Sequence, residues 1–215
     1  EIVRLAFKYA ESEKPGATHI NLPEDIAKEE VPEGVARKFI TTAPKNKEYA
    51  DIESIEHAAA AIFQAEHPVI LAGHSAVRAK ASKALTEFAT NLKIPVVNTM
   101  MAKGIVPYDN PYSMWTIGIP QKDYQNVILE KADLIITVGY DIVEFAPIKW
   151  NLKDDHKIIH IDSRPSHVNK LYQPVTEVIG DISDSLEKIG NRCHRTKEPE
   201  QALAIKRQMS KEHEQ

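Results

Sequence analysis

Four short segments place polar residues directly after apolar runs, where α/β proteins commonly bind ligands. These segments are Gly73-His74-Ser75, Thr99-Met100-Met101, Gly139-Tyr140-Asp141 and Asp162-Ser163-Arg164. The preceding runs are short and rich in β-branched residues, which is typical of buried strands. In one parallel sheet the four exits would lie along the same edge, which is where ligands bind.

Gly73 and Ser75 are candidates for binding a nucleotide phosphate. A glycine lets a phosphate approach the start of the following helix, where the serine could donate a hydrogen bond. However, no exit opens a G-x-G-x-x-G fingerprint, and the chain has no G-x-x-x-x-G-K-[ST] loop. The alternative is that Gly73 only makes the strand-to-helix turn. Asp162 joins these candidates, because an acid at a strand exit can bind a ribose hydroxyl.

Two further groups of residues could do chemistry, but their spacing argues against it. His160, Asp162 and His167 could be drawn as metal ligands, yet His167 lies beyond a turn that contains proline, and no third ligand is fixed. A solvated strand end is the favoured interpretation, and we predict no metal site. Asp141 and Glu144 could form a general acid/base pair, but no nucleophile or oxyanion motif accompanies them. An exposed loop explains the two acids equally well.

The segment Met100–Val106 combines two methionines, one lysine and one glycine immediately after a predicted strand. Lys103 could meet an anionic substrate there, although a plain surface lysine is the default interpretation. No Ser/His/Asp triad pattern and no Cys/His pairing is visible in the chain. Residue chemistry alone therefore indicates a Rossmann-like domain without naming its ligand.

Strands and helices alternate through the region that positions these exits. The predicted strands cover residues 69–73, 94–99, 134–139, 157–162 and 176–180. The first predicted helix has Ser54 as its N-cap, and its apolar stripe is Ile55, Ala58, Ala59, Ile62 and Phe63. Later helices are expected over 81–92, near 125–131 and from about Ser183 to Gly190, with a long loop between 99 and 125.

The predicted fold class is α/β. Strands that are apolar throughout are buried on both faces, as in parallel sheets, and strand-helix alternation gives right-handed crossovers. Residues 54–190 are therefore expected to form a doubly wound, Rossmann-like parallel sheet of five or six strands with helices on both faces.

The segments outside this core have a different character. A helix and a short strand, 17–23, open the chain, and Pro15-Gly16 separates them. Residues 24–53 are polar and irregular, which predicts a surface connector. Residues 191–215 are charged and lack a clear apolar stripe, so a partly helical linker is expected. Because the chain begins within a helical pattern and without methionine, we expect it to be a piece of a longer protein.

Bulk composition limits the partners. The chain of 215 residues is 42% hydrophobic and 27% charged, as in ordinary globular proteins. Its formal net charge of -4 gives no electrostatic reason to expect nucleic acid. No apolar run approaches the ~20 residues needed to cross a bilayer, so no membrane is expected. Cys193, the single cysteine, lies in the polar tail, and no signal peptide is visible. A cytoplasmic location is expected.

Taken in order, these segments resemble the central domain of thiamine-diphosphate-dependent enzymes, specifically acetolactate synthases of the catabolic type. The ordered set PVILAG, IPVVNTMMAKGIVP, ADLIITVGYD, IIHIDSRP and VIGDI is similar to the middle domain of that family. The opening AFKYAESEKPGATHINLPEDI resembles the last helix and strand of its N-terminal pyrimidine-binding domain. The resemblance therefore implies that 1–23 is a remnant of that domain, and that 191–215 leads towards a C-terminal diphosphate-binding domain.

The loop after residue 138 separates two kinds of acetolactate synthase. In the FAD-containing members an Arg-Phe-Asp-Asp-Arg-type segment follows the strand and helps to hold the flavin. Here Gly139-Tyr140-Asp141 leads into Ile142-Val143-Glu144-Phe145, without arginine, so a diphosphate would lose charge-assisted donors. The resemblance therefore implies a flavin-independent enzyme that makes acetolactate from pyruvate on the route to acetoin. FAD is expected to be absent and the loop to pack structurally.

The resemblance also implies that the reactive groups lie elsewhere. The family's activating glutamate belongs to the pyrimidine domain, and its Gly-Asp-Gly motif for Mg2+ and diphosphate belongs to the later domain; neither occurs in this chain. We therefore expect no catalytic residue here, an inactive fragment, and thiamine diphosphate and Mg2+ bound by the flanking domains. Lys103 is carried over as a substrate-channel residue, because AKG matches a GKG-like segment, although Ala102 replaces its first glycine.

Two alternatives stay open. The chain could be the middle domain of another thiamine-diphosphate carboligase or decarboxylase, or a stand-alone nucleotide-binding module that uses Gly73, Ser75 and Asp162. The expected partners are the flanking domains, pyruvate as the substrate of the parent, and further copies of the chain. A homo-oligomer is expected because the lone strand 17–23 would expose an edge that can pair with a neighbouring copy.

Overall fold

The computed structural model describes residues 2–12, 15–30, 47–118 and 124–213. The chain divides into two compact units, residues 1–46 and 47–215. We describe each unit by itself.

The first unit contains a confirmed helix but not the predicted strand. Its helices are α1 (Ile2–Glu11) and α2 (Glu24–Ala27). Residues 17–23 are extended and pair with no strand in the described part of the chain. A strand needs a hydrogen-bonded neighbour, whereas within the described residues this segment contacts α1 through a 3.1 Å bond from Thr18 Oγ1 to the Ala6 carbonyl. Of the predicted connector 24–53, residues 31–46 lie outside the described residues.

A parallel sheet forms the centre of the second unit. Among the residues that the structure describes, it has six strands, in the order β3-β2-β1-β4-β5-β6. The strands are β1 (Pro68–Ala72), β2 (Val96–Asn98), β3 (Ser113–Thr116), β4 (Leu134–Val138), β5 (Lys157–Asp162) and β6 (Thr176–Ile179). Every pairing is parallel. This is the doubly wound order of Rossmann folds, so the predicted fold class is confirmed. The order reverses between β1 and β4, which is the switch point of the sheet.

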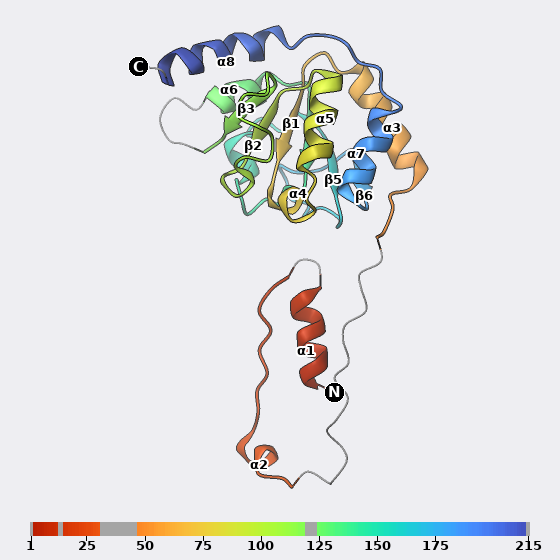
Figure 1. Cartoon of the computed structure of the whole chain (residues 1–215), viewed down its shortest axis with the longest axis vertical. Coiled ribbons are helices and arrows are strands. Elements are labelled where there is room, and N and C mark those ends of the chain that lie inside the picture. The colour runs from red at the N-terminus through yellow and green to blue at the C-terminus, as the bar shows by residue number, and fades with distance from the viewer. Residues whose placement is uncertain (1, 13–14, 31–46, 119–123, 214–215) are drawn as a thin grey trace. The chain divides into compact units, whose positions relative to one another are not determined.

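Helices cover both faces of this sheet (Figure 1). They are α3 (Ile52–Gln64), α4 (His74–Arg78), α5 (Ser82–Leu92), α6 (Tyr124–Glu130), α7 (Ile182–Gly190) and α8 (Glu200–His213), with short 3-10 helices η1 (Met100–Ala102) and η2 (Pro147–Lys149). Helices α3, α5 and α7 share one apolar cluster with the sheet, and α6 and α8 share the other.

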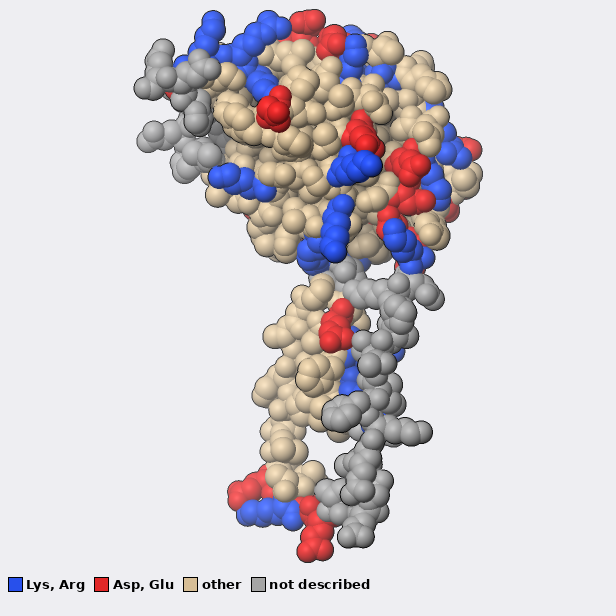
Figure 2. Space-filling model, viewed as in Figure 1, with Lys and Arg blue, Asp and Glu red and all other residues tan. Residues whose placement is uncertain are grey.

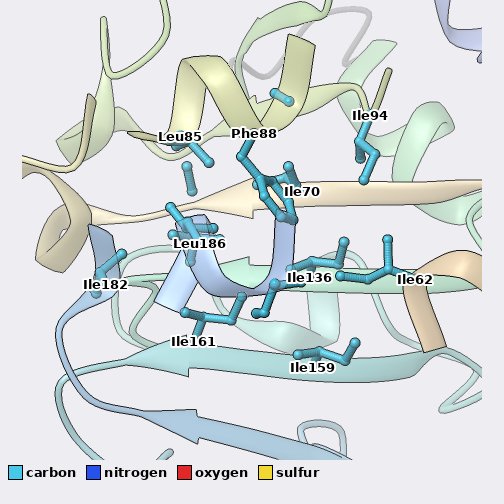
Figure 3. Packing of buried hydrophobic residues seen from close by; sticks show 14 of the residues in the cluster. Ile62, Ile70, Leu85, Phe88, Ile94, Ile136, Ile159, Ile161, Ile182 and Leu186 are labelled. Carbon is cyan, nitrogen blue, oxygen red and sulfur yellow. The ribbon is translucent and has the colours of Figure 1, made fainter. Parts of the chain in front are cut away.

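The two clusters arise because successive side chains of the buried strands point to opposite faces of the sheet. Ile70 and Ile136 point into the cluster under α3, α5 and α7 (Figure 3), whereas Leu71 and Ile135 point into the opposite one. Successive side chains of a strand face opposite sides of the sheet, so a wholly apolar strand can fill both clusters. The parallel sheet is therefore stabilised by hydrophobic burial on both faces.

The start of α3 corrects one prediction. The N-cap is Asp51 and not Ser54, because the Asp51 carboxylate accepts the main-chain N–H of Ser54 at 2.8 Å. An apolar stripe does not distinguish two capping residues that lie three positions apart. Phe63, assigned to the buried stripe, is 63% exposed, whereas Ile55 and Ile62 are fully buried.

The predicted loop between residues 99 and 125 contains a strand that the sequence did not indicate. β3 is an edge strand of four residues with a register irregularity against β2. Trp115 within it has a φ of +65°. A short strand with a bulky residue in the left-handed region gives no regular apolar run, which is why pattern analysis missed it.

The tail is partly helical, as predicted, and it packs on the domain. Ala202, Leu203 and Ile205 of α8 lie against the second apolar cluster. Cys193, expected in a polar tail, is only 2% exposed, and burial raises the pKa of its thiol. The guanidinium of Arg195 is buried as well.

Main-chain carbonyl groups from separate elements accept hydrogen bonds from Arg195. They belong to Glu66 at 3.2 Å, Leu92 at 3.1 Å and Lys93 at 3.3 Å. Arg195 also donates to Lys197 in its own segment at 2.6 Å. One cation therefore fixes the path of the chain between α7 and α8.

The surface of the second unit carries charges of both signs. On the face shown in Figure 2, basic and acidic side chains are interspersed and form no continuous basic field. Among the described residues, no helix has both the length and the apolar character that crossing a bilayer requires.

Replacing Arg195 should loosen the tail. Arg195→Ala leaves three carbonyls from two other segments without their donor, and should lower the free energy of unfolding by about 2–3 kcal/mol. Limited proteolysis should also cut before α8 faster than in the wild type. The matched control is Arg192→Ala, because Arg192 is exposed and, within the described residues, its guanidinium donates to the Lys188 carbonyl one turn earlier in the same segment. Equal stability of the two variants would contradict the role given to Arg195.

Acid should weaken a second tail contact. Glu198 accepts from Lys93 Nζ at 2.6 Å and from the Tyr112 hydroxyl at 3.2 Å, and the bond to Lys93 lowers the pKa of Glu198. A lowered pKa means that this stabilisation is complete above the ordinary value of 4.5 and is lost as pH falls through the folded value. Glu198→Gln should therefore melt below the wild type at pH 7 and nearly with it in strong acid. Glu87→Gln, which removes a carboxylate 3.9 Å from exposed Lys83, should change little at either pH.

Candidate functional site at the switch point of the sheet

The exits of β1 and β4 lie in direct main-chain contact. The N–H of Gly73 donates to the Val138 carbonyl, and that of Ser75 donates to the Gly139 carbonyl, both at 2.9 Å. A Cβ atom on Gly73 would lie 2.5 Å from Tyr140 Cα, and one on Gly139, where φ is +61°, would lie 2.1 Å from Ala76 N. The two glycines are thus required for this approach. The backbone of the loop after β4 packs directly against the turn at Gly73. This favours the interpretation that Gly73 only makes the strand-to-helix turn.

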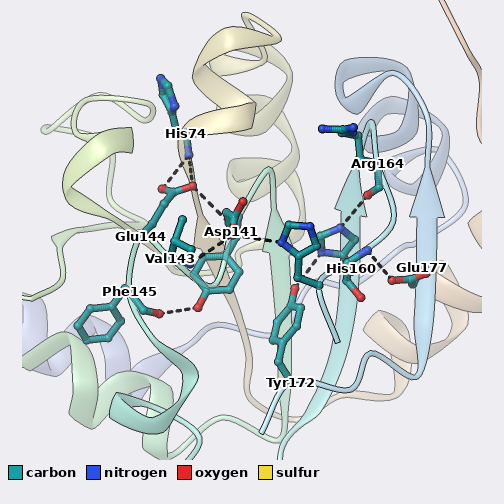
Figure 4. A network of polar contacts seen from close by, with 12 residues as sticks. His74, Asp141, Val143, Glu144, Phe145, His160, Arg164, Tyr172 and Glu177 are labelled. Atoms are coloured by element: carbon teal, nitrogen blue, oxygen red, sulfur yellow. Dashed lines mark hydrogen bonds and ion pairs between the residues drawn. The ribbon is translucent and has the colours of Figure 1, made fainter. Parts of the chain in front are cut away.

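The carboxylate of Glu144 lies where the exits of β1, β2 and β4 meet (Figure 4). It accepts the main-chain N–H of His74 at 3.0 Å to both oxygens, and that of Asp141 at 3.2 Å. The Thr99 hydroxyl donates to it at 2.6 Å. Three strand exits are therefore joined through one side chain. The sequence drew attention to Glu144 only as half of an acid/base pair.

Asp141 has a local structural contact of its own. Its carboxylate accepts the main-chain N–H of Val143 at 3.2 Å, and the ring of the exposed His167 lies 3.8 Å away. Asp141 and Glu144 thus both accept main-chain N–H groups from the loop after β4, which is the role of carboxylates that hold a loop in place.

The rest of that loop is held by aromatic packing. Tyr140 is 2% exposed and donates from its hydroxyl to the Phe145 carbonyl at 2.5 Å. Trp150 Nε1 donates to the Tyr140 hydroxyl at 3.2 Å, and the Tyr172 ring lies 5.5 Å from that of Tyr140. Burial raises the pKa of both tyrosines, so they remain protonated donors. This packing holds the loop in one conformation.

The end of β5 is buried, which corrects the prediction of a solvated strand end. Asp162 is 4% exposed and accepts the N–H of Ser163 at 2.6 Å and its hydroxyl at 3.1 Å. His160 is 2% exposed; Nδ1 lies 2.8 Å from the Tyr172 hydroxyl and Nε2 lies 3.1 Å from the Arg164 carbonyl. Across the described ranges, no three His, Cys, Asp or Glu side chains are grouped as metal ligands.

The structure does not bring the nucleotide candidates together. Gly73 and Ser75 lie at the exit of β1, whereas Asp162 lies at the exit of β5, with β4 between them. Ser75 is buried, and its N–H is already bonded to Gly139. Binding of a nucleotide by these three residues stays a prediction, and their geometry lends it no support.

Lys103 lines a separate cavity of about 500 Å³ beyond β2 and β3. Trp115 and Tyr108 line it too, with their rings stacked 4.6 Å apart. Lys103 itself is exposed, and Gln125 at the cavity is held by a 2.8 Å bond to the Met114 carbonyl. No pattern in the sequence indicated the aromatic pair, because the strand that carries Trp115 was not predicted.

A comparison with known protein families identifies the family of this domain. The sequence profile of the family described as "Thiamine pyrophosphate enzyme, central domain" matches residues 55–189. The chain belongs to this family. The matched residues begin in α3 and end in α7, so they span the sheet, and the predicted resemblance to thiamine-diphosphate-dependent enzymes is confirmed.

Curated relatives agree with the family. The chain is 33% identical over 190 residues to the acetolactate synthase of Bacillus subtilis, covering 88% of this chain and 33% of that protein. It is 31% identical over 194 residues to the catabolic acetolactate synthase of Raoultella terrigena, covering 89% and 34%. It is 27% identical over 187 residues to the glyoxylate carboligase of Escherichia coli O157:H7, covering 86% and 31%. The chain thus spans about a third of the length of these relatives.

The residues of this chain do not fit a thiamine diphosphate and Mg2+ site. The sequence has no Gly-Asp-Gly segment, and the part of the chain that the structure describes holds no cluster of metal-ligating side chains. The switch point does not fit a flavin diphosphate either, because the carboxylate of Glu144 occupies the donors there.

A methyl group at Gly139 should be far more costly than one at Gly104. Both residues have positive φ, +61° and +83°, but a Cβ on Gly104 meets nothing within 4 Å. Gly104→Ala should cost about 1–2 kcal/mol from backbone strain alone. Gly139→Ala adds a main-chain clash with Ala76 and should lose several kcal/mol or fail to fold. Denaturant unfolding compares the two, and similar losses would contradict the close approach.

Proposed function

We propose that this chain is the central domain of an acetolactate synthase whose parent condenses two pyruvates. In that reaction two pyruvate ions and one proton give one acetolactate and CO2. The observation that carries the proposal is the family match over the whole sheet, together with relatives from two bacteria that are named acetolactate synthases. The parent would be a transferase or lyase on the route to acetoin.

The proposed subtype is flavin-independent and catabolic. The loop from Gly139 to Asn151 contains no arginine for a diphosphate. Glu144 also presents a negative charge at the position that a nucleotide phosphate would need. Both observations support a domain without FAD.

We further propose that flanking domains supply the cofactors, thiamine diphosphate and Mg2+. Residues 1–23 would belong to a pyrimidine-binding domain, and residues 191–215 would lead to a diphosphate-binding domain. In support, no residue of α1 is buried within the described part of the first unit, and its apolar residues Ile2, Leu5 and Phe7 are exposed. Exposed apolar residues on one helix are suited to burial against another domain. The isolated chain would then be inactive.

Lys103 is proposed as a wall residue of the substrate channel. Its ammonium group is accessible at the cavity beyond β2 and β3, where it could attract the carboxylate of pyruvate. A homo-oligomeric parent in a reducing cytoplasm completes the proposal.

A second candidate is a carboligase that acts on another 2-keto acid. It is favoured by the similarity to a protein named glyoxylate carboligase. The two candidates would share the fold and the release of CO2. They would differ in which 2-keto acid the channel accepts.

Assay of the parent enzyme separates these functions. The purified parent, supplied with thiamine diphosphate and Mg2+, should form acetolactate from pyruvate and show no flavin absorbance. Preference for glyoxylate would favour the second candidate, and bound flavin would contradict the proposed subtype.

Lys103→Ala in the same enzyme should lower kcat/KM for pyruvate about tenfold, equivalent to one charge-assisted contact. The control is Lys153→Ala, because Lys153 is exposed and pairs with Glu130 on the surface. Unchanged kinetics in Lys103→Ala would remove Lys103 from the channel wall.

A further inference from the structure

We propose that the carboxylate of Glu144 is an internal anion that fills the phosphate position of this Rossmann fold and excludes nucleotides from it. Glu144 would thus determine the ligand specificity of the switch point. The proposal deepens the flavin-independent assignment and rests on it, but it does not depend on which 2-keto acid the parent uses.

The bonds to Glu144 are those that an oxyanion requires. Within the described structure, its oxygens accept two main-chain N–H groups, from His74 and Asp141, and the hydroxyl of Thr99. Thr99 is 1% exposed, so its 2.6 Å bond is protected from competing water. Hydrogen bonds from such donors to an ionised acceptor are stronger than those between neutral groups. The site therefore binds a negative charge, and the protein itself provides that charge.

The position of this carboxylate is the one that nucleotides use in doubly wound folds. Their diphosphates bind where the strand order reverses, beside the turn after the first strand. Here that turn is Gly73-His74, and a Cβ on Gly73 would lie 3.0 Å from Glu144 Oε1. The main-chain N–H of His74 donates to the carboxylate of Glu144, and that of Ser75 donates to the Gly139 carbonyl. An incoming phosphate would find these donors occupied and a like charge in its place.

The loop that carries Glu144 is held in place on both sides of this residue. The next residue, Phe145, is 8% exposed, and its carbonyl accepts the hydroxyl of buried Tyr140. Trp150 in turn donates to the same hydroxyl. The aromatic packing of the loop therefore positions the backbone from which the carboxylate projects, and the three hydrogen-bond donors hold the carboxylate itself.

Removing the carboxylate should convert the site into an anion site. In the 215-residue chain, Glu144→Ala leaves the N–H groups of His74 and Asp141 and the Thr99 hydroxyl without their acceptor. Inorganic pyrophosphate, titrated at constant ionic strength, should raise the melting temperature of this variant by about 2–4 °C at roughly four times its Kd. The wild type should show no such rise. ADP and FAD, titrated next, show whether only the diphosphate or a whole nucleotide is accepted.

Two further variants make the test specific. Glu177→Ala removes another carboxylate that accepts a main-chain N–H, from Ser166 at 2.9 Å, and should be destabilised without any response to pyrophosphate. Glu144→Gln keeps the size but weakens the acceptor, so amide exchange at His74 and Asp141 should become at least tenfold faster. This measurement decides the matter if Glu144→Ala does not fold.

Several results would overturn the proposal. They are a folded Glu144→Ala that ignores pyrophosphate, an equal response in wild type or Glu177→Ala, and unchanged exchange in Glu144→Gln. These outcomes are separable from failure of the proposed function. A parent that makes acetolactate without flavin, combined with an unresponsive Glu144→Ala, would remove only the role of Glu144. A parent that holds flavin in this domain would remove both.

Discussion

Two main-chain turns, one after β1 and one after β4, lie so close together that a side chain fits at neither Gly73 nor Gly139. A Cβ on Gly139 would lie 2.1 Å from the nitrogen of Ala76. The contact extends the β1–β4 pairing by two further hydrogen bonds, from Gly73 and Ser75. The remaining features at this edge follow from it, because it sets the positions of the Gly73-His74 turn and of the loop that carries Glu144. Backbone approach, and not side-chain chemistry, defines the switch point.

The same edge of the sheet is closed at its centre and open on the side of β2 and β3. At the exits of β1 and β4, hydrogen bonds and buried aromatic rings fill the space, and the carboxylate of Glu144 takes up the free donors. Beyond β2 and β3 a cavity of about 500 Å³ remains, with Lys103 and a stacked Tyr108–Trp115 pair on its wall. Under the proposed function, a domain built in this way would shape a neighbouring active site through its open cavity. This division agrees with membership in a family of central domains.

The tail contains residues whose structural role is evident only from their burial. By composition it resembles a linker, yet Cys193 and Arg195 are almost fully buried. Arg195 is tolerated inside because carbonyl oxygens at the ends of other elements accept hydrogen bonds from its two terminal nitrogens, which offsets part of the cost of burying the guanidinium. Helix α8 then covers part of the second face of the sheet through a few small and aliphatic residues.

The sequence by itself determined the fold class, because wholly apolar strands such as β1 and β4 and the stripe of α5 carry their period locally. The ordered segments also pointed to the enzyme family. Only the tertiary structure decided which strand exits meet, that Glu144 joins three of them, and that Asp162 and His160 are buried. The same holds for β3 and for the packing of the tail. Several of these features depend on contacts between distant residues, such as Thr99 and Glu144, which are 45 positions apart. The strand β3 depends instead on one unusual φ at Trp115. Composition and periodicity report only on neighbours along the chain, so they could not reveal contacts that folding creates between distant segments.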